Sequence, residues 1–144
     1  MTTQANSTDR GRQRGRQRPA TSSPPSQPGP NPRKLAASIL GTIGRTQGFS
    51  NRILDHELSR VPGLSTRDRG LTTSLVYGVL RHRGRLDAVI DHFAQKPRGL
   101  KGQVRTALRI GAFELLELGH PLHAVASEVA KLLRKVGNGK MLRP

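Results

Sequence analysis

Apolar residues recur with helical spacing through nearly the whole chain after residue 31, and this periodicity constrains the fold more than any other feature. Leu35, Ile39, Leu40 and Ile43, for example, would share one face of a helix. No alternating apolar and polar run of useful length appears, so strands are not expected. The pattern predicts an all-α bundle of five or so helices.

Capping and breaking residues place the expected helix boundaries. Asn31 followed by Pro32 is typical of a helix start, and Ser65 with Asp68 resembles a capping box. Whether Gly84 breaks the third helix stays open at this point. The fourth helix is apolar on nearly every side, which predicts a central position in the bundle. The expected helices span approximately residues 32–46, 50–60, 66–84 with a continuation toward 96, 101–118 and 122–136.

The first 31 residues differ from the rest in composition. They contain three apolar residues, five of the ten prolines and five Arg against one Asp. Such a segment buries too little apolar surface to offset chain entropy, so residues 1–31 are predicted to be a disordered tail and residues 32–144 the folded domain. A solubilising extension and a transit peptide are alternative interpretations of the tail. Its candidate phosphate-binding residues are Arg10, Arg12, Arg14, Arg16 and Arg18.

The net charge of the 144 residues is +16, which favours a polyanionic partner. The tail contributes +4, and the remaining 20 basic and 8 acidic residues contribute +12. Several basic residues stand at expected helix starts, where each opposes the helix dipole by roughly 0.3–1 kcal/mol but would favour an anion. Arginine enrichment from a GC-rich genome is the alternative explanation. The candidate nucleic-acid contacts in the folded part are Arg33, Lys34, Arg67, Arg69, Arg81, Arg83, Arg85, Arg98, Lys101, Arg105 and Arg109.

The chain has only four aromatic residues, and all four stand at positions expected in the core: Phe49, Tyr77, Phe93 and Phe113. A surface that stacks splayed bases is therefore not expected, and binding should be mainly electrostatic.

No catalytic or metal-binding pattern was found. The absence of cysteine excludes disulfides, thiol nucleophiles and thiolate metal sites. Gly137-Asn-Gly-Lys140 lacks the rest of a phosphate-binding loop, and His120 with His123 lacks further metal ligands. No apolar run reaches the ~20 residues of a membrane span, and no signal peptide is apparent. The expectation is a cytoplasmic protein without cofactor, metal, membrane partner or catalytic activity of its own.

Six motifs in order resemble the NusB-like RNA-binding domain over about residues 33–136. More closely, they resemble the version at the N-terminus of the rRNA cytosine-C5 methyltransferases of the RsmB/Sun type. The motifs are Phe49-Ser-Asn-Arg-Ile-Leu54, Arg67-Asp-Arg69, Leu75-Val-Tyr-Gly-Val-Leu-Arg81, Leu86-Asp87, Val104-x-x-x-Leu108-Arg-Ile-Gly-Ala-Phe-Glu-Leu-Leu116 and Pro121-Leu-His-Ala124.

The resemblance implies a helical bundle that binds RNA, in this branch ribosomal RNA, with a basic patch at the start of the first helix, here Arg33 and Lys34. The methyltransferases also use a cysteine nucleophile and an S-adenosylmethionine domain, which this chain does not contain. The family domain normally ends in a further helix, and here the sequence reads Gly-Lys-Met-Leu-Arg-Pro144 where that helix should begin. A truncated methyltransferase and a stand-alone remnant are both consistent with this pattern.

Three functions are consistent with the sequence. The first is an RNA-binding module related to rRNA methylation. The second is a transcription antitermination factor that acts through RNA and a ribosomal protein. The third is a protein-interaction domain whose basic charge is incidental.

Overall fold

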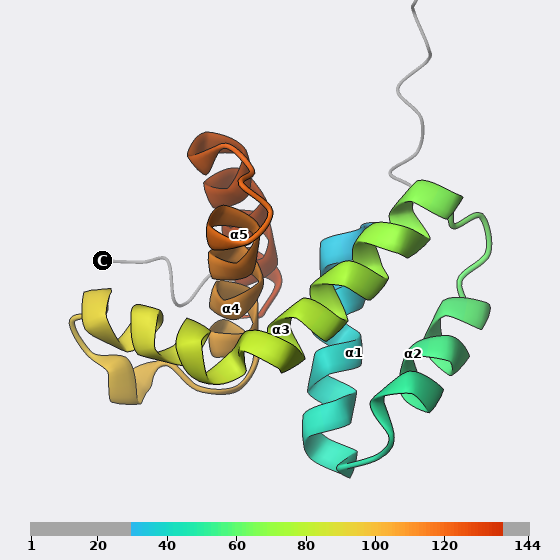
Figure 1. Ribbon diagram of the computed structural model, residues 1–144, viewed down its shortest axis with the longest axis horizontal. Helices are drawn as coiled ribbons and strands as arrows, with labels where there is room; N and C mark the ends of the chain where they lie inside the picture. Colours follow the sequence, from blue (N-terminus) through green and yellow to red (C-terminus); the bar gives the residue numbers. More distant parts are fainter. Residues whose placement is uncertain (1–29, 137–144) are drawn as a thin grey trace, which may run out of the picture.

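The computed structural model describes residues 30–136, and over those residues it is helical without any strand (Figure 1). The all-α prediction is therefore confirmed. The arginines of the predicted tail and the sequence from Gly137 onward lie outside the described residues. The elements are α1 (Pro32–Thr46), α2 (Ser50–Ser59), α3 (Thr66–Phe93), the short 3-10 helix η1 (Pro97–Gly99), α4 (Gly102–Leu116) and α5 (Leu122–Val136).

The helix starts follow the capping residues. The Asn31 side chain accepts hydrogen bonds from the backbone N–H groups of Arg33 and Lys34, and Ser65 Oγ accepts one from Asp68 at 3.1 Å. Both predicted starts are confirmed. Gly84 itself lies within a helical segment, but the 28-residue element α3 consists of two helical segments joined at a kink. The kink lies at His82, two residues before Gly84, where φ is −105° and ψ is 15°.

The long helix α3 connects the two halves of the molecule. In Figure 1, α1 and α2 lie beside its first half, and α4 and α5 lie beside its second half. Helix α4 contacts α1, α3 and α5, and α1 contacts all four of the other α-helices, so α4 shares the predicted central position with α1. The core is aliphatic and includes the fully buried Ile39, Leu75, Leu86 and Ile110.

Two glycines allow the helices around α4 to approach closely. A Cβ at Gly78 in α3 would lie 2.1 Å from Cζ of Phe113 in α4, and one at Gly111 would lie 2.6 Å from Cγ2 of Val129 in α5. No side chain fits at either distance. The missing Cβ atoms therefore let α4 pack against both neighbours.

The prediction that all four aromatic residues lie in the core is wrong. Phe113 is buried, but Phe49, Tyr77 and Phe93 expose 74%, 40% and 80% of their surface. Phe49 precedes the first turn of α2 and Phe93 ends α3, so both lie where helix packing has stopped. Helical periodicity identifies a face of a helix but not how far along it the packing extends.

Candidate nucleic-acid interface

The first predicted nucleic-acid contact, Arg33, makes an internal ion pair. Its Nε donates hydrogen bonds to both carboxylate oxygens of Glu114, at 3.0 and 2.9 Å, and Glu114 is completely buried. Nδ1 of His120 lies 3.0 Å from the same carboxylate. The hydrogen bonds to Glu114 raise the pKa of the Arg33 guanidinium, against the lowering effect of burial. Arg33 therefore fastens α1 to α4.

Arg105 and Arg109 belong to a second internal network. Arg109 donates two hydrogen bonds to Asp87, at 2.7 and 2.9 Å. Arg105 donates to Asp87 at 3.2 Å and to Asp91 at 2.7 Å, and also to the carbonyl oxygens of Leu100 and Pro97. Both arginine side chains are only 15% exposed. The network joins the first half of α4 to the second half of α3 and to the segment between them.

This network predicts that part of the folding stability is lost at acidic pH. Hydrogen bonding from Arg109 is the main cause that holds the pKa of Asp87 below its ordinary value. Since the folded-state pKa is the lower one, ionised Asp87 stabilises the fold above the unfolded-state value of about 3.9, and this contribution is lost as the pH falls further. Asp87→Asn should therefore lower the urea midpoint at pH 7, and the difference from the parent protein should shrink below about pH 4.

A matched control for this pH dependence is Asp55→Asn, because Asp55 is exposed and makes no ion pair with the described residues. Its urea midpoint should follow that of the parent protein at every pH. A difference for Asp87→Asn that stays constant from pH 7 to pH 3 would contradict the assignment.

The other predicted basic residues remain on the surface. Arg85 donates to Glu117 at 2.6 Å, but its side chain is 60% exposed. The structure does not bring all of these residues together on one cavity. Among the described residues, those of the predicted set that make no ion pair are Lys34, Arg67, Arg69, Arg81, Arg83, Arg98 and Lys101.

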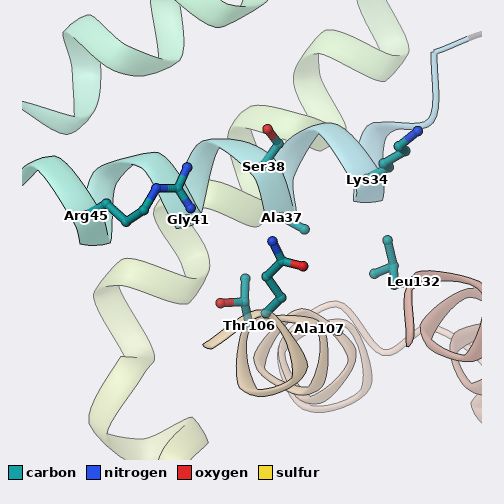
Figure 2. A pocket seen from close by; sticks show the side chains of 9 residues that line it. Lys34, Ala37, Ser38, Gly41, Arg45, Thr106, Ala107 and Leu132 are labelled. Atoms are coloured by element: carbon teal, nitrogen blue, oxygen red, sulfur yellow. The ribbon is translucent and has the colours of Figure 1, made fainter. Parts of the chain in front are cut away.

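Two of these unpaired cations, together with Arg45, line a cleft between α1 and α4. Two adjoining cavities of about 210 and 420 Å³ share Gly41, Arg45, Gln103 and Thr106 in their lining. Figure 2 shows the residues that line the smaller one. Lys34 lines the smaller cavity and Arg83 the larger. We call the pair of cavities the α1–α4 cleft. Figure 2 shows Lys34 and Arg45 toward opposite ends of α1, with Ala37 between them facing α4.

The polar side chains that line the α1–α4 cleft are cations, an amide and hydroxyls. Its polar lining consists of the cations Lys34, Arg45 and Arg83, the amide of Gln103 and the hydroxyls of Ser38 and Thr106, and the paired Arg105 and Arg109 also line the larger cavity. No carboxylate lines either cavity. No side chain caps the N-terminus of α4, so backbone N–H groups add to the positive potential. Such a surface suits phosphate groups.

Arg45 was not among the predicted contacts. It stands in the last turn of α1, where the helix dipole stabilises a cation, so its position gave no sign of a function beyond helix stability. The spacing of polar and small residues along α1 could have identified Arg45. Residues 34, 38, 41 and 45 recur at intervals of three and four, which places Lys34, Ser38, Gly41 and Arg45 on one face of the helix.

Fold and cleft together define an all-helical module with a cationic groove. Residues 30–142 match the model of the NusB family, and the chain belongs to that family. None of the described helices has the length and apolar character needed to cross a membrane. No solved structure matches the chain significantly.

The curated relatives are of two kinds. The chain is 43% identical over 96 residues to the ribosomal RNA small subunit methyltransferase B of Thermus thermophilus, which covers 67% of this chain and 23% of the relative. It is 31% identical over 110 residues to a putative methyltransferase of Mycobacterium tuberculosis, covering 76% and 24%. It is also 29% identical over 116 residues to the transcription antitermination protein NusB of Chloroflexus aggregans, covering 77% of each. The chain thus spans about a quarter of the methyltransferases it matches.

Proposed function

We propose that this chain is an RNA-binding module that holds the phosphate backbone of RNA in the α1–α4 cleft. The observation that carries the proposal is the composition of the cleft, where Lys34, Arg45 and Arg83 come from two helices without any carboxylate among them. Most acidic residues of the described part are engaged in ion pairs elsewhere. The cations of the cleft are therefore available for phosphate.

The methyltransferase relatives favour ribosomal RNA as the class of ligand. We assign this chain the binding role alone, because the similarity covers about a quarter of those enzymes. Methyl transfer would then belong to parts of the relatives that this chain does not span. On this proposal the module needs no cofactor or metal.

The salt dependence of binding tests the proposal. If the module neutralises about six phosphates of a single strand, log K should fall by roughly four per decade of salt in filter binding. The double variant Arg45→Glu/Arg83→Glu removes two such contacts. It should bind at least about tenfold more weakly and show a salt slope shallower by roughly 1.4.

A matched control changes the charge equally elsewhere. Arg60→Glu/Lys131→Glu also alters the net charge by four, and both residues are exposed and line neither cavity of the cleft. Its affinity should stay within a few-fold of the parent protein. Equal losses in both double variants would assign the effect to net charge, and a salt slope near zero in the parent protein would remove the RNA-binding proposal.

A transcription antitermination factor is the second candidate function. The match to the antitermination protein supports it because that match covers 77% of both chains. Competition binding separates the two candidates. Preference for a structured rRNA hairpin supports the first, whereas preference for a short single-stranded leader RNA, together with co-purification of a ribosomal protein, supports the second. Absence of RNA binding at moderate salt would instead favour a protein-interaction domain.

A further inference from the structure

A further cavity, of about 700 Å³, opens between the start of α2 and the middle of α3. Ser50 lines it from α2, Tyr77 and Arg81 line it from α3, and Phe113 of α4 forms part of its wall. Leu80 lines both this cavity and the α1–α4 cleft, so the two adjoin across α3. Its volume lies within the range of small-molecule sites.

One exposed aromatic ring lines this cavity, and a second exposed ring belongs to the residue that precedes Ser50 in the sequence. Tyr77 is 40% exposed, although neighbouring Val76 is fully buried. Phe49, next to Ser50, is 74% exposed, and the guanidinium of Arg52 lies 5.6 Å from its ring centroid. Exposed rings with adjacent guanidinium groups are the surfaces on which unpaired bases stack.

The polar groups at the cavity also suit a nucleotide. Ser74, Tyr77 and Arg81 recur at intervals of three and four, which places them on one face of α3. The hydroxyl groups of Ser74 and Tyr77 can donate and accept hydrogen bonds, and Arg81 makes no ion pair with the described residues. No carboxylate lines the cavity. A cationic, hydroxyl-rich cavity fits a base and its phosphate better than it fits an apolar or basic segment of a protein.

We propose that this cavity binds an unpaired base of the RNA, with the ring of Tyr77 stacked on the base and Arg81 on an adjoining phosphate. The proposal rests on the proposed RNA binding and adds that the ligand is single-stranded at this point. It also reverses the expectation, drawn from the sequence, that the protein lacks a stacking surface.

The composition provides a direct probe of the cavity. Tyr77 is the only tyrosine and the chain has no tryptophan, so intrinsic tyrosine fluorescence reports on this position alone. The full chain is titrated with a single-stranded RNA oligonucleotide of about twelve nucleotides, within the usual site size. Inorganic polyphosphate of similar charge serves as the ligand control. The oligonucleotide should quench the fluorescence after correction for its absorbance, and polyphosphate should bind without quenching it.

Two variants extend the test to affinity. Tyr77→Leu should weaken oligonucleotide binding by roughly 5- to 150-fold, the usual effect of losing one stacked base, while leaving the salt slope unchanged. Tyr77→Phe should retain most of the affinity. Phe93→Leu is the matched control, because Phe93 is an exposed aromatic residue at the far end of α3 and lines a different cavity. Its affinity should equal that of the parent protein.

The outcomes distinguish this inference from the function on which it rests. If the oligonucleotide binds with a steep salt slope but neither quenches Tyr77 nor discriminates Tyr77→Leu, the base site is overturned and RNA binding stands. If the oligonucleotide does not bind at all, the proposed function fails first. Equal quenching by polyphosphate would also overturn the base site, because polyphosphate has no ring to stack.

Discussion

Arg33→Met should destabilise the protein by about 3–5 kcal/mol, the usual cost of removing one partner from a buried ion pair. The substitution keeps an apolar side chain of similar length but leaves the carboxylate of Glu114, which is completely buried, with only His120 beside it. Urea unfolding followed by the helical circular-dichroism band measures the loss. We expect a large fall in the midpoint with an unchanged helical spectrum in the remaining folded protein.

Two further variants make this prediction specific. Lys34→Met changes the neighbouring exposed cation and should alter stability by less than about 0.5 kcal/mol. The double variant Arg33→Met/Glu114→Met removes both charges and should recover much of the loss, since apolar replacement of a buried pair is often neutral. Equal effects of Arg33→Met and Lys34→Met would show that the ion pair does not hold α1 against α4.

Gly78→Ala should destabilise the protein by about 2–3 kcal/mol, although alanine normally favours a helix over glycine. The added Cβ would stand 2.1 Å from the ring of Phe113, which is 5% exposed and packed in the core. Either that ring leaves its place or α3 moves away from α4. Thermal unfolding measures the cost as a fall in Tm of the order of 10 °C for a domain of this size.

The control for Gly78→Ala is the same change elsewhere on the same helix. At Gly84 and at Gly70 an added Cβ meets no atom within 4 Å. Alanine at either position should therefore raise stability by roughly 0.5–1 kcal/mol through helix propensity alone. A stabilising effect at Gly78 as well would mean that α3 and α4 are separated by more than the structure indicates.

Most of the fold could be predicted from the sequence because helix capping and helical periodicity depend on residues close together in the chain. Asn31 and Ser65 mark helix starts whose caps involve only residues two or three positions away. The kink of α3 at His82, rather than at Gly84, has no local signal of this kind, and the sequence left the course of the chain here open. The exposure of Phe49 and Phe93 depends on where neighbouring helices end. Periodicity contains no information about either.

The candidate site was harder to predict because the charge of a basic residue does not show whether it pairs with a carboxylate inside the protein. Arg33, Arg105 and Arg109 looked like surface cations, yet their carboxylate partners lie 14 to 81 positions away along the chain, on other helices. Arg45 was missed for the opposite reason, because its place in α1 looked ordinary. Only the three-dimensional structure separates the basic residues that form internal ion pairs from those that remain free for a ligand.

The Arg33–Glu114 pair has a consequence for folding during synthesis. Its two residues are 81 positions apart, so the chain must be made almost to the end of α4 before α1 gains its polar anchor. Contacts between distant residues form late and slow folding, whereas α1, α2 and the first half of α3 can associate early. A ribosome that pauses before α4 emerges would therefore present a nascent chain whose first helix is assembled on one side and still uncovered on the other.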